Sequence, residues 1–494
     1  MRIPLDREGD QPLYQQIEDF LREGILAGSL PPETQLPASR QLAKELGVNR
    51  LTVERAYADL EVDGLIYARM GSGTYTLPPP SLPPASTDEA GSPLPLWQSI
   101  LQDNHAVTAP PTSDTLLHAA EQTFTIAFDG GTGDPRLFPV EEFRKLLQHV
   151  MRRDGLAALE YGDRRGYAPL RTTIAQVLTS QGLRAHPDHL LITSGSQQSL
   201  ALIAQLLLDA GDTVLVENPT YSGALALFRS LKLKLVGVPM DEEGMQVEHV
   251  ERLLQQHHPK LIYTMPTFHN PTGVCLSTAR RRQLLALAAL YNVPIVEDDF
   301  VGDLRYEGRA QPALKALDAG GNVIYISSFS KMLMPGLRIG FLLAEGPIYE
   351  RLTHVKWLHD LASSNLIQHA LATYVTIGRY QMHLRRSCRL YRKRRDAMLA
   401  ALERYLPSEV RFTVPQGGLF IWLRLPEGLS SEAVLAAAHK AGVTAASGTN
   451  FFLDHSAGDP YLRLSFASVT PALIETGIQR LGQALQVVKN FAKK

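Results

Sequence analysis

A stretch rich in proline and serine divides this chain of 494 residues into a short and a long part. It begins at Leu77-Pro78-Pro79-Pro80, and residues 79–115 keep the same low-pattern composition. Such a composition favours extended conformations and cannot build a hydrophobic core. We therefore expect a multidomain protein, with one domain in residues 1–78, a linker in 79–115 and a second domain in 116–494.

The short part has the pattern of three helices followed by two strands. Apolar residues at helical spacing predict helices over residues 12–27 and 38–46, and a third from the N-cap Asn49 to Gly64. Two short strands, 66–69 and 74–77, flank a glycine-rich tip. This order of elements predicts a winged helix-turn-helix, whose third helix enters the major groove of double-stranded DNA.

Three segments of the short part closely resemble the GntR family of bacterial regulators: Leu36-Pro37-Ala38-Ser39-Arg40, Asn49-Arg50-Leu51-Thr52 and Gly71-Ser72-Gly73-Thr74. Residues 1–78 hold eight Arg or Lys against twelve Asp or Glu, but the expected DNA face is locally basic. A module that serves only protein contacts is the alternative. The resemblance implies that the residues in contact with DNA are Ser39, Arg40, Asn49, Arg50, Thr52, Arg55, Gly71, Ser72 and Gly73.

In the long part, predicted helices alternate with short apolar strands at 190–192, 213–216, 261–264 and 295–296. This alternation predicts an α/β fold, with a mostly parallel sheet covered by helices on both faces. Ligands of such folds gather at the carboxyl ends of the strands.

Lys331 is the first candidate for chemistry because it follows a buried, β-branched strand and lies in a loop. A partly desolvated lysine amine can form a Schiff base (an aldimine) with an aldehyde such as that of pyridoxal 5'-phosphate (PLP). Ser328 and Arg338 are well placed to hold a phosphate. A further anion site is expected where Ser194-Gly195-Ser196-Gln197 opens a helix, and Tyr221 follows a strand where its ring could stack on a flat cofactor.

The string from Ser328 to Gly340, S-F-S-K-x-L-x-P-G-L-R-x-G, resembles the cofactor-lysine signature of PLP enzymes of the aspartate aminotransferase fold. The resemblance implies PLP as cofactor, with Ser330 in its binding loop and a smaller C-terminal subdomain over about residues 380–494. Asn270-Pro271-Thr272-Gly273 is similar to the turn whose asparagine bonds the cofactor's phenolic oxygen. Asp298 stands where relatives have the aspartate that pairs with the pyridine nitrogen, so Lys331 and Asp298 are the expected catalytic residues.

The same resemblance implies a substrate site and a homodimer. Arg463 matches the arginine that binds the substrate's α-carboxylate. Gly131 opens the stretch Gly131-Thr132-Gly133-Asp134, which resembles the N-terminal G-x-P-D loop of relatives with glycine where proline is usual. Tyr161 matches the tyrosine that reaches the phosphate of the neighbouring subunit. Relatives usually have a tyrosine shortly after the aspartate, where this chain has Phe300 and Val301, so we expect slow or absent transamination.

A GntR-type module joined to an aminotransferase-like domain resembles the MocR/GabR subfamily of regulators. It implies a PLP-dependent transcriptional regulator that senses an amino acid, an amine or PLP itself. The alternatives are an active aminotransferase with an attached DNA-binding module, and a DNA-binding protein whose large domain no longer holds cofactor. We expect a cytoplasmic protein with no membrane partner and no metal site, because the chain has two cysteines, a formal net charge of −1 and no long apolar run.

Overall fold

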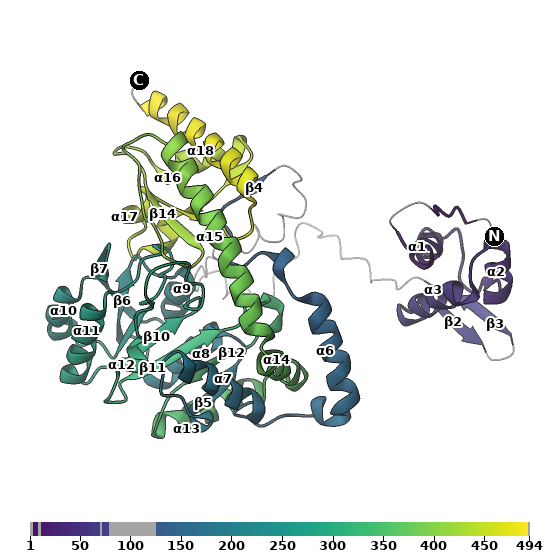
Figure 1. Ribbon diagram of the computed structural model, residues 1–494, viewed down its shortest axis with the longest axis horizontal. Helices are drawn as coiled ribbons and strands as arrows, with labels where there is room; N and C mark the ends of the chain where they lie inside the picture. The colour runs from purple at the N-terminus through teal and green to yellow at the C-terminus, as the bar shows by residue number, and fades with distance from the viewer. Residues whose placement is uncertain (1–2, 8–10, 70–71, 79–124, 493–494) are drawn as a thin grey trace, which may run out of the picture. The chain divides into compact units, whose positions relative to one another are not determined.

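The computed structural model in Figure 1 describes residues 3–7, 11–69, 72–78 and 125–492. The chain forms two compact units, Met1–Ala106 and Val107–Lys494. The multidomain fold expected from the sequence is confirmed. The expected linker, 79–115, and the residues up to 124 lie outside the described residues, so the proposed domain limits stay a prediction.

The first unit is a small helical domain with a three-stranded antiparallel sheet in the order β1-β3-β2. Its own hydrophobic core includes Ile17, Leu42, Val53 and Leu60, so all three helices pack together. Its elements are α1 Leu13–Leu26, β1 Gln35–Leu36, α2 Ser39–Leu46, α3 Arg50–Val62, β2 Ile66–Arg69 and β3 Gly73–Thr76.

The turn between α2 and α3 is short because both ends are capped. Helix α2 ends at Gly47, whose φ of 61° is readily adopted only by a residue without a Cβ. Helix α3 begins after Asn49, whose Oδ1 accepts a hydrogen bond from the Leu51 backbone N–H at 3.0 Å. These caps produce the helix-turn-helix, and β2 and β3 form the wing.

The second unit contains an eight-stranded sheet in the order β5-β12-β11-β10-β9-β6-β7-β8. The five strands from β11 to β7 are parallel, β12 is antiparallel to both of its neighbours, and β8 is antiparallel to β7. The strands are β5 Leu190–Thr193, β6 Thr213–Asn218, β7 Lys234–Asp241, β8 Gly244–Met245, β9 Leu261–Thr264, β10 Ile295–Asp299, β11 Val323–Ser328 and β12 Gly340–Leu343.

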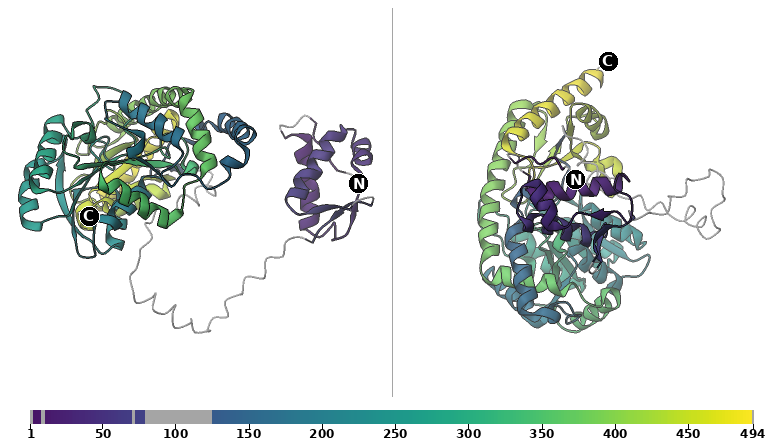
Figure 2. Two further views of the ribbon diagram at one scale, coloured as in Figure 1. Left: turned by 90° about the horizontal axis from the view of Figure 1, so that it is seen from below. Right: turned by 90° about the vertical axis from the view of Figure 1, so that its right-hand side faces the viewer.

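Helices cover both faces of this sheet, which is why the side chains of β5, β9 and β12 are buried throughout (Figures 1 and 2). The carboxyl ends of the parallel strands meet at one edge, where ligands of such sheets bind. The helices are α6 Val140–Arg153, α7 Ala168–Ser180, α8 Ser196–Leu207, α9 Ser222–Ser230, α10 Val250–His257, α11 Thr278–Tyr291, α12 Leu314–Leu317, α13 Pro347–Asp360 and α14 Asn365–Thr376.

A second layer of the same unit is built on a four-stranded antiparallel sheet in the order β13-β14-β17-β16. Strand β4, Ile126–Ala127, pairs with β15, Val443–Thr444, so the first described residues of this unit lie in its C-terminal layer. The remaining elements are α15 Arg379–Tyr405, β13 Arg411–Phe412, β14 Phe420–Arg424, α16 Ser431–Lys440, β16 Ala446–Ser447, α17 His455–Gly458, β17 Tyr461–Ser465 and α18 Pro471–Ala492.

Within the described ranges, no helix is both long and apolar enough to cross a membrane. The same part of the chain contains no group of His, Cys, Asp and Glu side chains that could hold a metal ion.

Candidate cofactor and DNA-binding sites

Lys331 lies in the turn that follows β11 and is half-buried. Burial, together with the positive charges of Arg463 and Arg338, lowers the pKa of Lys331 to about 8. An amine with a lowered pKa is unprotonated, and therefore nucleophilic, in a larger fraction of molecules near neutral pH. The position expected from sequence to carry covalent chemistry thus has the electrostatics that such chemistry needs.

Arg338 ties the Lys331 turn to the loop that precedes α8. Its Nη1 donates to Ser330 Oγ at 3.4 Å, and its Nη2 donates to the Ser194 carbonyl at 2.6 Å. Ser328 Oγ accepts from the Ser330 backbone N–H at 3.1 Å. A Cβ at Gly195, where φ is 112°, would lie 3.0 Å from Arg338 Nη2. Two hydroxyls and a guanidinium therefore gather beside a loop that needs glycine for its close approach.

The same loop presents the start of α8, which has no side-chain cap. Its first backbone N–H groups, beginning at Ser196, remain without intrahelical partners and can receive an anion. The Gln197 side chain instead donates to the Gly223 carbonyl at 3.1 Å, so that side chain points toward α9. Combined with Arg338, this helix start has the donors that a phosphate group requires.

Asp298 lies within β10, which extends three residues beyond the strand expected from sequence. Tyr263 donates to Asp298 Oδ2 at 2.9 Å, whereas Oδ1 is buried with no hydrogen-bond partner among the described residues. Burial raises the pKa of Asp298 to about 7. A buried carboxylate oxygen without a donor is costly, and the N–H of a protonated heterocycle such as the PLP ring would satisfy it.

Tyr221 shares the electrostatic neighbourhood of these groups. Burial raises the pKa of its hydroxyl, and the charges of Asp298, Arg463 and Arg338 also act on it. Tyr221 precedes α9 at the N-cap position. The structure therefore brings this tyrosine close to the residues that the sequence placed around the cofactor.

Arg463, on β17, is a buried cation held by neutral acceptors. Its Nη1 donates to Asn270 Oδ1 at 3.0 Å, and its Nη2 donates to the carbonyls of Asp129 and Gly130 at 2.8 and 3.3 Å. Its guanidinium lies 4.2 Å from the centre of the Phe420 ring. Burial lowers the pKa of Arg463 to about 10, and its Nε has no hydrogen-bond partner among the described residues.

A ligand carboxylate would therefore give Arg463 the anionic partner that it lacks in the described part of the chain. Gly131, which sequence analysis placed near the substrate, follows directly on the carbonyl of Gly130 that Arg463 contacts. Sequence reasoning missed Tyr263 and the two carbonyls of the 129–130 loop. The place of Tyr263 in the strand beside β10 was the only available signal for it.

Phe300 and Val301, the residues found where relatives usually have a tyrosine, are both buried. The Phe300 ring stacks against Phe420 with their centres 6.5 Å apart. Neither residue can donate a hydrogen bond from its side chain, so neither replaces the hydroxyl of that tyrosine.

Tyr161 is not brought to Lys331. Its side chain is 83% exposed and lines a shallow hollow with Trp357, Leu361 and Ala362. An exposed position is compatible with a contact to another subunit but does not demonstrate one.

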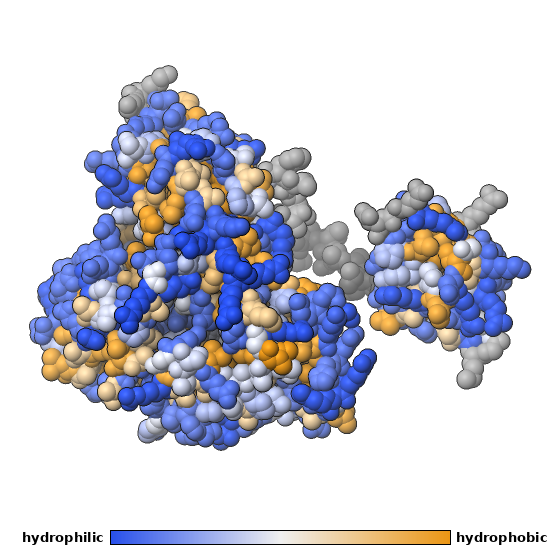
Figure 3. Space-filling view, in the orientation of Figure 1, coloured by the Kyte–Doolittle hydropathy of each residue, from blue (hydrophilic) through white to orange (hydrophobic). Residues whose placement is uncertain are grey.

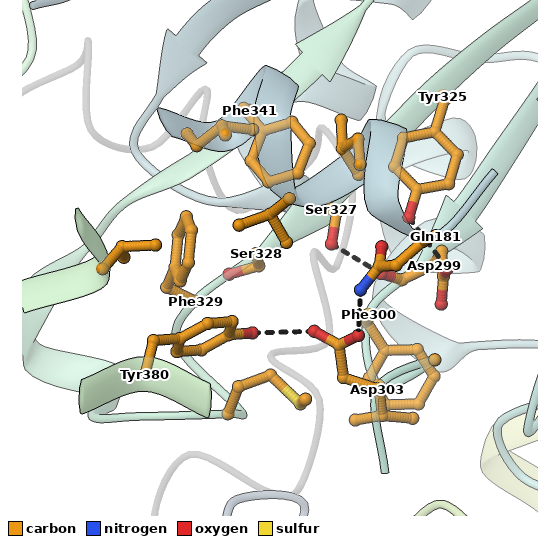
Figure 4. Close-up of a pocket in the computed structure, with 17 residues that line it drawn as sticks. Gln181, Asp299, Phe300, Asp303, Tyr325, Ser327, Ser328, Phe329, Phe341 and Tyr380 are labelled. Carbon is orange, nitrogen blue, oxygen red and sulfur yellow. Dashed lines mark hydrogen bonds between the residues drawn. The ribbon is translucent and has the colours of Figure 1, made fainter. Parts of the chain in front are cut away.

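A second cavity, of about 40 Å³, lies beside β10 and β11 and is shown in Figure 4. Tyr325 donates to Asp299 and Tyr380 donates to Asp303, each at 2.8 Å. Ser328 borders this cavity, but Lys331, Asp298 and Arg463 do not line it. Its volume suits water molecules and not a cofactor, so we assign the chemistry to the Lys331 side.

In the first unit, several expected DNA contacts already have partners within the chain. Arg50 Nε donates to Glu54 Oε1 at 2.6 Å, and Ser39 Oγ donates to the same oxygen at 3.3 Å. Arg55 donates to the Tyr14 hydroxyl at 3.0 Å, and its guanidinium lies 3.8 Å from the Tyr14 ring centre. These side chains would have to exchange partners, or share them, to contact DNA.

The other expected contacts differ in how available they are. Arg40 is exposed, Thr52 is half-buried, and Asn49 uses its side-chain oxygen as the N-cap of α3. Ser72 and Gly73 are exposed at the wing. Gly71 lies outside the described residues.

Comparison with known proteins agrees with this division into two units. Residues 13–76 match the model for bacterial regulatory proteins of the gntR family, and residues 128–481 match the model for aminotransferase class I and II. The chain is 32% identical to the uncharacterized HTH-type transcriptional regulator YdfD of Bacillus subtilis (strain 168), covering 95% of this chain and 96% of that protein. It is 31% identical to the probable rhizopine catabolism regulatory protein MocR of Rhizobium meliloti, covering 99% and 97%.

Among solved structures, the second unit is similar to kynurenine aminotransferase of Pyrococcus horikoshii, which was solved in complex with PMP. The TM-score is 0.74 and the sequence identity is 37%, covering 79% of this chain and 99% of that one.

Proposed function

This chain belongs to the MocR/GabR-type subfamily of gntR-family transcriptional regulators, in which a helix-turn-helix domain precedes an aminotransferase class I and II domain, and from that membership we propose that it binds PLP at Lys331 and senses an amino compound or PLP itself. The DNA-binding residues named above, a homodimer and a cytoplasmic location form part of the same proposal.

The observation that carries the proposal is the buried Oδ1 of Asp298, which has no hydrogen-bond partner among the described residues. The charges of Arg463 and Arg338 act both on Tyr221, together with that of Asp298, and on Lys331, whose pKa is lowered. PLP supplies an aldehyde and an electron-withdrawing ring. Asp298 Oδ1 would accept the ring N–H, and the Lys331 amine would hold PLP covalently through the aldehyde carbon, whose oxygen would be released as water. Arg338, Ser330 and the start of α8 would hold the phosphate, and Tyr221 would pack against the ring.

The chemistry of Arg463 favours an effector with a carboxylate. Its Nε lacks a hydrogen-bond partner among the described residues, and its other contacts are to neutral oxygens. An effector of this kind regulates DNA binding only if its affinity differs between two arrangements of the protein. Amines without a carboxylate are therefore expected to bind more weakly than amino acids.

An active aminotransferase is the second candidate, because Lys331, Asp298 and Arg463 lie in one neighbourhood. The apolar pair Phe300 and Val301 weakens that reading, since no side-chain hydroxyl stands there to tune the cofactor. Rapid multiple turnovers with amino and keto acids would favour the enzyme over the sensor.

The proposal is tested by incubating the full chain with PLP, reducing it with borohydride and locating the added mass. We expect one adduct, on Lys331, and an increase in the unfolding temperature on PLP binding. Lys331→Ala should lose both effects, whereas Lys440→Ala, a change at an exposed lysine of the same unit, should keep both. A wild-type chain that gains no mass at Lys331 would refute PLP binding there.

Regulation is tested separately, by fluorescence anisotropy with DNA from upstream of the protein's own gene. Amino acids and matched decarboxylated amines are added to the PLP-loaded chain. We expect at least one amino acid to change the affinity for DNA and its matched amine to act at higher concentration. If no amino compound and no change in PLP loading alters the affinity, the sensing role is wrong.

A further inference from the structure

The outer face of α15 carries a row of exposed cations. Arg385, Arg386, Arg389, Arg392 and Lys393 are all exposed, and the spacing i, i+1, i+4, i+7, i+8 puts them on one side of a helix. No Asp or Glu occurs between Arg379 and Arg395 in the sequence. In the orientation of Figure 3, hydrophilic side chains gather along the course of this helix.

In the part of the chain that the structure describes, most of these cations have no anionic partner. Among the described residues, only Arg392 of the five has a carboxylate within ion-pair distance, with Glu307 at 3.8 Å and Asp396 at 4.0 Å. The buried arginines of the same helix are different, since Arg394 pairs with Asp134 at 2.5 Å and Arg395 with Glu307 at 2.7 Å. In the described part of the chain, the inner arginines Arg394 and Arg395 are thus neutralised, whereas four of the five outer cations have no carboxylate within ion-pair distance.

An unpaired row of this kind is unfavourable for the isolated helix, because like charges four residues apart repel each other. Arg385, Arg389 and Lys393 form two such pairs in succession. A helix face that only contacts water has no need for a row of like charges. A bound polyanion would attract every cation in the row and so offset their mutual repulsion. Four of the five cations are arginines, which match phosphate oxygens with forked contacts.

We propose that this basic face of α15 binds the sugar-phosphate backbone of double-stranded DNA beside the site held by the winged helix-turn-helix. The inference rests on the proposed DNA binding of the first unit. Residues 385 to 393 extend over about 12 Å of helix axis, and DNA carries one negative charge per about 1.7 Å. Several phosphates therefore fall within reach of the row. The contact would add affinity without reading bases.

Helix α15 also contacts the candidate cofactor site on its inner side. The His383 Nε2 lies 2.8 Å from the carbonyl oxygen of Met332, the residue that follows Lys331. DNA on the outer face and a ligand at Lys331 would thus act on one rigid element. This gives the second unit a direct part in DNA binding.

The test uses the full chain with Arg385→Gln, Arg386→Gln, Arg389→Gln and Lys393→Gln together. The affinity of the protein for DNA is measured at several salt concentrations with two DNA fragments. The short fragment contains only the site of the winged helix-turn-helix, and the long fragment adds flanking DNA on both sides. On the long DNA fragment we expect the slope of log K against log salt to become less steep by about 3.6, because each of the four lost phosphate contacts removes about 0.9. On the short DNA fragment, the wild type and the variant should have equal slopes.

A matched control removes the same charge elsewhere on the second unit, through Lys232→Gln, Lys234→Gln, Arg252→Gln and Lys440→Gln, which are exposed and do not lie on one helix. It should keep the wild-type slope on both fragments. Thermal unfolding and the PLP adduct at Lys331 establish that both variants fold.

Equal slopes for the wild type and the α15 variant on the long fragment would overturn the inference and favour an acidic protein partner for this face. Failure of the wild type to bind either DNA fragment would instead contradict the proposed DNA binding of the first unit, and with it this inference, while leaving PLP binding at Lys331 to its own test.

Discussion

Lys331 combines a half-buried position with two nearby guanidinium groups, which together lower its pKa to about 8. Because only the neutral amine attacks an aldehyde, we expect the rate of PLP attachment to rise with pH and to reach half its maximum near pH 8. Below that pH the reactive fraction falls about tenfold per unit. Borohydride trapping followed by mass analysis across pH measures the profile.

Arg463→Gln removes one of the two charges and should shift this midpoint upward. Arg480→Gln, at an arginine whose Nη1 donates to the Ala441 carbonyl, is the control and should leave the midpoint in place. A wild-type midpoint near the ordinary lysine value would contradict the electrostatic account.

Tyr263 supports Asp298 through its only hydroxyl, at 2.9 Å from Oδ2. That hydrogen bond opposes the upward shift that burial causes in the pKa of Asp298. Tyr263→Phe should therefore raise this pKa further, leave less carboxylate for the PLP ring and weaken PLP binding by about tenfold, which corresponds to ~1.4 kcal/mol. Equilibrium dialysis measures the affinity.

The matched control is Tyr349→Phe, whose hydroxyl donates to the Leu190 carbonyl at 3.2 Å, at the opposite end of β5 from Gly195. It should bind PLP as the wild type does. Equal affinities for wild type and Tyr263→Phe would show that Asp298 needs no such support.

At the scale of elements, apolar spacing predicts the three helices and the strand pair of the first unit, and it predicts β9 to the residue. Apolar spacing does not predict the C-terminal end of β10, because the charged residues Glu297 and Asp299 look like the end of a strand. In the structure they are inside the strand, since Glu297 accepts from the backbone N–H groups of Leu314 and Lys315, each at 2.8 Å. Partners that are distant in sequence decide where such a strand stops.

The same dependence on distant partners explains which parts of the candidate site can be found from the sequence. Lys331 and Arg338 stand in one local string, so their neighbourhood is visible in the sequence. The contact of Arg463 with the Asp129 carbonyl joins residues 334 positions apart and depends on how two layers pack. No local pattern carries that information.

Helix α3 depends on its cap, so Asn49 has a structural role as well as its expected DNA contact. Asn49→Ala should reduce the opening free energy of the first turns of α3 by about 1 kcal/mol, and Asn49→Ser should restore most of it. Hydrogen–deuterium exchange of the α3 amides in the full chain measures the effect. If alanine exchanges no faster than asparagine, the cap contributes nothing and any loss of DNA binding in that variant is a direct contact.

At the scale of the whole molecule, charge must act locally. The chain has a formal net charge of −1, and residues 1–78 contain more acidic than basic residues, so neither can attract DNA through its overall field. The locally basic DNA face expected for the first unit and the basic face of α15 are consequently the surfaces where salt dependence should originate.

The proposed homodimer makes the strongest prediction at this scale, because Tyr161 is 83% exposed and lines a hollow that Lys331 of its own chain does not line. If its hydroxyl reaches the phosphate in the other subunit, Tyr161→Phe homodimers should bind PLP about five- to tenfold more weakly, as loss of a charge-assisted hydrogen bond predicts.

Subunits carrying Tyr161→Phe and subunits carrying Lys331→Ala are then co-expressed with different tags, and the mixed dimers are purified. In them, the intact Lys331 belongs to the Tyr161→Phe subunit and faces the intact tyrosine of the other, so wild-type affinity should return. Mixed dimers of wild type and Lys331→Ala serve as the reference. Affinity that stays low in the first mixture would mean that Tyr161 acts within its own chain or only through folding.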